Sequence, residues 1–173
     1  TEDVLGGFEA RRDGMIRSLA GKPFVPAEKK SARKDDRGAF TRDYIYSVTD
    51  YVMKSFWLGE QNEEANAALA EMCRYYIADS AARDSPDSFY WAADVLCRLV
   101  EFFGSSGTRD AVRMSRETED AVFEVMWLWV RKHSLVTDAE VEKSRTWSFS
   151  GSENHHLQRF STCWQFSKIL GKD

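Results

Sequence analysis

Apolar side chains recur every three or four positions along most of this chain, the spacing that places them on one face of an α-helix. Long stretches show this repeat at about residues 3–20, 44–56, 62–77, 85–103, 116–132 and 152–170, and a capping-box motif begins a short helix at Thr137. Glycine follows most of the stretches, and no strand run requires a sheet partner. The pattern predicts an all-α protein of antiparallel helical hairpins.

Two of the predicted helices carry apolar residues that decide how they should pack. In the last helix the stripe consists of Leu157, Phe160, Trp164 and Ile169. In the helix before the short one, Trp127 and Leu128 widen the apolar face, which predicts burial on two sides. We therefore expect Trp127 and Trp164 to lie in the core.

The length and the aromatic content fit one helical domain over residues 1–173. Of its residues 43% are hydrophobic and 13% aromatic, which is enough apolar area to close a core. The helix lengths vary and no internal sequence repeat is visible. This favours an irregular stacked or toroidal arrangement of helix pairs over a regular solenoid.

Charge and cysteine content narrow the classes of partner and cofactor. A formal net charge of −4 argues against a nucleic-acid partner, because phosphate binding requires a clustered basic surface. No apolar run approaches the ~20 residues of a membrane-spanning helix. Cys73, Cys97 and Cys163 are widely spaced within predicted helices, which is typical of small buried side chains. We therefore expect no metal site, no cofactor and no membrane span.

The segment 147–156 is rich in side chains that bind or transfer protons, and it lies where a loop becomes the last helix. Unpaired amides at a helix N-terminus attract anions. The same positive end disfavours imidazolium, which keeps a nearby histidine neutral and able to accept a proton. Asn154 can meanwhile donate a hydrogen bond to a carboxylate.

The string Ser152-Glu153-Asn154-His155, entering an aromatic helix in a chain of helix pairs, resembles the α/α-toroid polysaccharide lyases of the heparinase and alginate lyase type. The resemblance implies an incomplete α/α toroid, with 1–173 the N-terminal part of a larger catalytic domain. It also implies β-elimination on a uronic-acid-containing polymer, in which Asn154 neutralises the sugar carboxylate and His155 takes part in abstracting the C5 proton. An acidic polysaccharide is then the partner, and an extracellular or periplasmic location is favoured.

Four neighbouring residues are candidates for substrate binding: Glu153, His156, Arg159 and Trp147. The Arg159 guanidinium can pair bidentately with a carboxylate or sulfate, and Trp147 can offer an apolar face to a sugar ring. Structural roles compete at these positions. Asn154 and Glu153 also suit a helix start, and Arg159 also suits a surface ion pair.

The resemblance leaves alternatives open, because such lyases also use a tyrosine from further along the chain and none follows His156. The upstream candidates lie on predicted helical stripes, where packing explains them better: Tyr44, Tyr51, Tyr75, Tyr76 and Tyr90. The main alternative is a non-catalytic helical scaffold or interaction domain, in which the Asn-His segment is only a capped turn. A hydrolase would require two facing carboxylates, which the sequence does not identify.

Overall fold

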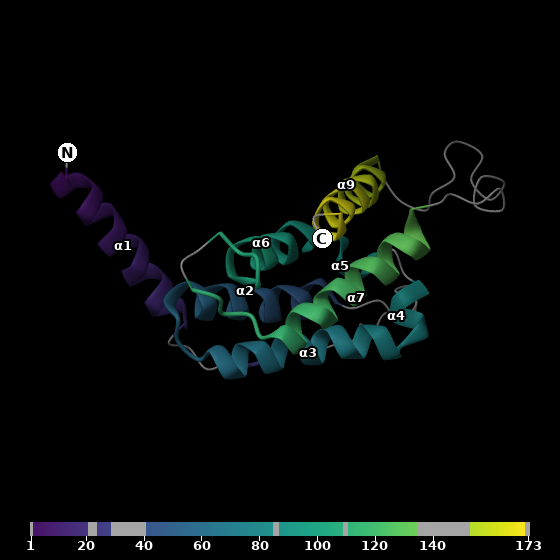
Figure 1. Ribbon diagram of the computed structural model, residues 1–173, viewed down its shortest axis with the longest axis horizontal. Coiled ribbons are helices and arrows are strands. Elements are labelled where there is room, and N and C mark those ends of the chain that lie inside the picture. The colour runs from purple at the N-terminus through teal and green to yellow at the C-terminus, as the bar shows by residue number, and fades with distance from the viewer. Residues whose placement is uncertain are drawn as a thin grey trace.

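The structure, a computed structural model, describes residues 2–20, 24–28, 41–84, 87–108, 111–134 and 153–171. Its helices are α1 (Glu2–Ala20), α2 (Arg42–Leu58), α3 (Asn62–Ala78), α4 (Ser80–Asp84), α5 (Asp87–Tyr90), α6 (Ala93–Phe103), α7 (Arg116–His133) and α9 (Glu153–Leu170). No strand occurs in these ranges, and the predicted all-α class is confirmed. Figure 1 shows α1 extending from one end of the molecule, while the other long helices pack together.

Helices α2 and α3 form the hairpin that the sequence predicts. Thr41 caps α2, because its side-chain oxygen accepts the Tyr44 N–H at 3.1 Å. The helix ends at Gly59, whose φ of 72° is a left-handed conformation that glycine adopts at little cost. A Cβ at this position would lie 2.6 Å from Nη2 of Arg113, so the turn also lies close to the segment that enters α7.

The single helix predicted over 85–103 is wrong in its first half, where α5 is interrupted before α6 begins. Ser88 is extended and Phe89 has a φ of 69°. A positive φ in a residue other than glycine, as at Phe89, costs about 1–3 kcal/mol, and tertiary contacts offset that cost. The Trp129 indole N–H donates to the Ser88 carbonyl at 2.7 Å, and the buried Phe89 ring packs edge-on against Tyr76. The buried indole thus takes a carbonyl that a continuous helix would have used internally.

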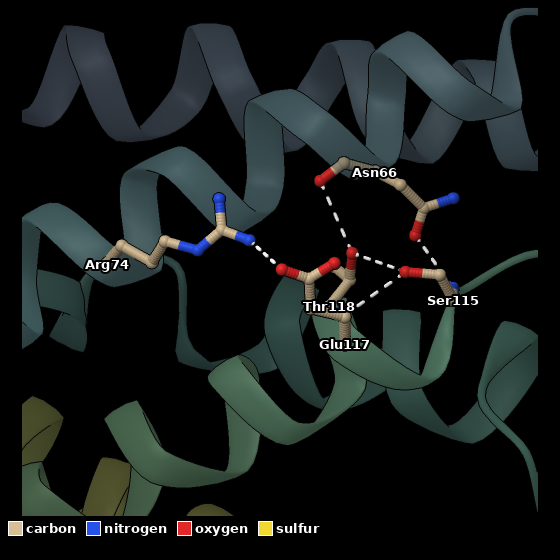
Figure 2. Close-up of polar contacts among 5 residues, drawn as sticks. All are labelled: Asn66, Arg74, Ser115, Glu117 and Thr118. Atoms are coloured by element: carbon tan, nitrogen blue, oxygen red, sulfur yellow. Dashed lines mark hydrogen bonds and ion pairs between the residues drawn. The ribbon is translucent and has the colours of Figure 1, made fainter.

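Asn66 on α3 fixes the start of α7 (Figure 2). Its amide nitrogen donates to the Arg113 carbonyl at 2.9 Å, and its amide oxygen accepts the Ser115 N–H at 2.8 Å. Ser115 caps α7, because its hydroxyl accepts the Thr118 N–H at 3.2 Å. On the exposed side, Arg74 forms an ion pair with Glu117.

Helix α9 packs against α6 and α7 through a different face from the predicted one (Figure 1). Of the expected stripe only Ile169 is buried, whereas Leu157, Phe160 and Trp164 are 67%, 52% and 64% exposed. The buried face consists of Arg159, Thr162, Phe166 and Ile169. These positions also follow helical spacing, and two of them are polar, so apolar content alone did not identify the face that packs.

The exposure of Trp127 corrects a second packing prediction. This side chain on α7 is 55% exposed, whereas Trp129, two positions on, is fully buried and contacts the Phe166 ring of α9. Successive positions on a helix are 100° apart, so one α7 face meets α9 and Trp127 lies outside it.

The core forms where α2, α3, α6, α7 and α9 meet. Its largest fully buried side chains include Trp129, Tyr44, Tyr76, Phe56, Phe89, Phe103 and Phe166. Cys73 and Cys97 are buried among them, as predicted, and Cys163 is half-buried. Burial raises the pKa of the Cys73 thiol to about 12, which leaves it protonated and unreactive at neutral pH.

Candidate functional site

Helix α9 begins at Glu153, so the Asn-His segment belongs to its first turn. This agrees with a helix that starts directly after Gly151. Trp147 lies outside the residues that the structure describes, and so do the side chains of Glu153, Asn154, His155 and His156. The described part of the site is therefore the α9 backbone at positions 153–156 and the residues that hold this end of the helix in place.

Arg159, one turn after position 155, lies in the junction between α9 and α7. Its side chain is 7% exposed, and its Nε donates to the main-chain carbonyl of His133 at 2.8 Å. The last carbonyls of a helix have no partner within that helix, and a cation beside them is favoured by the helix dipole. Cys163 adds a weak contact, with its Sγ 3.9 Å from the same carbonyl. Arg159 thus joins the first half of α9 to the end of α7.

His133 is the residue in this junction that sequence reasoning missed. Its ring is 5% exposed, and its Nε2 lies 3.0 Å from the main-chain carbonyl of Arg83 on α4. A carbonyl only accepts hydrogen bonds, so Nε2 carries the proton in this contact. The ring also packs 5.0 Å from that of Trp129. The signal in the sequence was a histidine in the last turn of α7, where a buried donor can reach the carbonyl of a neighbouring segment.

An ion pair reinforces the same end of α7 at the surface. Lys132 Nζ lies 2.8 Å from a carboxylate oxygen of Asp84 on α4. The hydrogen bond from Lys132, together with its positive charge, lowers the pKa of the Asp84 carboxyl. Helices α4, α7 and α9 are therefore connected through residues 132, 133 and 159.

The upstream tyrosines divide into core residues and surface residues. Tyr44 and Tyr76 are buried, as packing predicts. Burial raises the pKa of Tyr44 to about 12 and that of Tyr76 further. Neither hydroxyl can therefore lose its proton near neutral pH. Tyr51 is partly exposed and stacks on Phe24, with ring centroids 4.4 Å apart, and the Tyr90 side chain lies outside the described residues.

The described ranges hold neither a cluster of metal ligands nor a membrane-spanning helix. Within them, no group of three or more His, Cys, Asp or Glu side chains is arranged to hold a metal ion. None of the helices in those ranges combines the length and the apolar character needed to cross a membrane.

Comparison with known proteins finds no matching protein family, no matching curated protein and no matching solved structure. The site is therefore interpreted from its own residues and from the motif at the start of α9.

Proposed function

We propose that this chain supplies part of an active site for β-elimination on a uronic-acid-containing polysaccharide, within a helix-pair architecture of the incomplete α/α-toroid type. The observation that carries the proposal is the start of α9 at Glu153, which puts Asn154 and His155 in the first turn of a long helix. The main-chain amides of a first turn favour an anion, and a uronate carboxylate is the anion that this chemistry requires.

In the proposed reaction Asn154 donates a hydrogen bond to the uronate carboxylate as negative charge develops on it. This stabilises the enolate-like transition state. Neutral His155 accepts the proton from C5. The C5–H electron pair forms the C4–C5 double bond, the C4–O bond breaks, and water protonates the departing oxygen. The products are an unsaturated uronate at the new non-reducing end and a free hydroxyl on the released sugar.

Positioning supports the same proposal, because elimination requires the base and the carboxylate partner to keep a fixed geometry. Arg159 joins the first half of α9 to α7 through the His133 carbonyl at 2.8 Å. We assign Arg159 a positioning role, which differs from the direct substrate contact that its residue type suggests. Glu153, His156 and Trp147 are proposed as substrate contacts.

The test is elimination by the full chain on separate uronic-acid polymers, followed by the ultraviolet absorbance of the unsaturated product. A general base contributes roughly 10²–10⁴-fold, so His155→Ala should lose about a hundredfold or more, and Asn154→Ala should also lose activity. Gln158→Ala, an exposed position of the same helix, is the matched control and should keep full activity. Circular dichroism checks that each variant keeps its helix content. Product from no polymer, or full activity in both site variants, would refute the proposal.

A second candidate function is a non-catalytic helical interaction domain. The observation that favours it is the exposed apolar row on α9 formed by Leu157, Phe160 and Trp164, because contiguous exposed apolar surface marks interaction sites. The elimination assay separates the two candidates, since an interaction domain yields no unsaturated product from any polymer.

A further inference from the structure

A groove runs between α6 and the second half of α9, away from the Asn-His turn. Its volume is about 290 Å³, near the lower end of the range for small-ligand sites. The lining residues are Asp94, Cys97, Arg98 and Glu101 from α6 and Trp164, Gln165, Lys168 and Ile169 from α9. Trp164 is ten residues after Asn154, which is about 15 Å along the helix at 1.5 Å per residue.

Trp164 is the large apolar side chain of this groove, and it faces solvent instead of the core. It is 64% exposed, and the Lys168 ammonium lies 5.6 Å from its ring centroid. A large aromatic surface in water gains free energy when a ligand covers it, and its flat face suits another flat apolar surface. Beside it the groove is lined by Cys97 and Ile169, two apolar side chains that are almost fully buried.

The remaining lining side chains offer hydrogen bonds of both kinds. Asp94 and Glu101 accept, Arg98 and Lys168 donate, and Gln165 does both. An inorganic anion would pair with the two cations but leave the two carboxylates without donors, and a purely apolar ligand would remove charged groups from water without pairing them. A sugar ring fits both features, since it has an apolar C–H face and a rim of hydroxyls that donate and accept.

We propose that the α6–α9 groove binds a pyranose ring of an acidic polysaccharide, with Trp164 as the stacking surface. Arg98 pairs with a uronate carboxylate, and Asp94 and Glu101 accept hydrogen bonds from sugar hydroxyls. The identity of the polymer rests on the proposed function, whereas the stacking site rests on the groove alone. The groove is then a second subsite on the helix that carries the Asn-His turn.

Affinity electrophoresis of the full chain tests this in gels that contain polygalacturonate, alginate, hyaluronan or heparin, with polyglutamate as a sugar-free polyanion. At least one polysaccharide should retard the wild-type chain more than polyglutamate does. Trp164→Ala should weaken that binding roughly tenfold, and Trp164→Phe should keep part of it. Trp127→Ala is the matched control, because Trp127 is similarly exposed but lies outside the groove. It should bind as the wild type does.

Three outcomes would overturn the groove proposal: no retardation by any polysaccharide, equal retardation by polyglutamate, or equal weakening in the Trp164→Ala and Trp127→Ala variants. The elimination assay is scored separately. Retardation that depends on Trp164 without unsaturated product would refute elimination and support the groove. Unsaturated product together with binding that does not depend on Trp164 would support elimination and refute the groove.

Discussion

The two ends of α7 are held by different chemistry. At its start, short neutral side chains act: Asn66 reaches across from α3, and Ser115 caps the helix (Figure 2). At its end, long basic or aromatic side chains act: Arg159 comes from α9, and His133 reaches the Arg83 carbonyl. Both ends satisfy backbone groups that the helix leaves unpaired, N–H groups at the start and a carbonyl at the end.

The difference decides how much each contact contributes to stability. The Arg159 guanidinium is buried, so water does not readily replace it as the donor to the His133 carbonyl when the side chain is removed. The Asn66 amide is only partly buried, and water can replace some of its contacts. We therefore expect the C-terminal junction of α7 to be the more sensitive of the two to substitution.

Arg159→Ala is the substitution with the largest expected effect. It removes a charged donor from the His133 carbonyl and also the buried stem of the side chain, and hydrogen bonds to charged groups contribute about 1.5–3 kcal/mol. The free energy of unfolding should fall by about 3 kcal/mol in urea titrations. Arg159→Lys should lose less, because it keeps the charge and most of the stem.

Arg131→Ala is the matched control, since Arg131 lies in the last turn of α7 and is exposed. Its effect should stay within about 0.5 kcal/mol. Equal losses for Arg159→Ala and Arg131→Ala would show that the buried contact does not hold the junction, and would remove the positioning role assigned to Arg159.

Asn66→Ala sharpens the comparison at the other end. The variant loses the donor to the Arg113 carbonyl and the acceptor for the Ser115 N–H, which together should cost about 2 kcal/mol. Asn66→Asp keeps the acceptor but cannot donate, so its loss should be about half as large. Both values come from chemical denaturation. An aspartate variant as unstable as the alanine variant would show that the retained acceptor gives no net stabilisation once a carboxylate oxygen faces the Arg113 carbonyl.

The same contrast explains how far the sequence could predict this molecule. Ser115 and Gly59 were identifiable because a cap depends on local spacing, and the starts and ends of most helices followed from such signals. The kink at Phe89 was not identifiable, because its cause is the Trp129 indole, forty residues further along the chain. Local patterns predict helices, whereas distant partners decide where they break.

The candidate site shows the limit more clearly. The start of α9 was predicted from its polar turn, but the face that packs was not. Leu157 and Trp164 lie on one helical stripe and Arg159 on another, and the spacing alone does not show which stripe is buried. A pattern of hydrophobic positions assigns the apolar residues, and not an arginine, to the buried face. It carries no information about a carbonyl at the end of another helix that makes burial of the arginine favourable.

The ion pair between Arg74 and Glu117 supplies the smallest expected effect, and it tests whether the neutral network alone holds the start of α7. Both side chains are more than half exposed, and pairs of this kind contribute about 0–1 kcal/mol. A double-mutant cycle with Arg74→Ala and Glu117→Ala should give a coupling energy below about 0.5 kcal/mol that decreases further in high salt. A coupling that matches the Asn66→Ala loss and persists in salt would mean that charge holds this end too. The contrast between the two ends of α7 would then not hold.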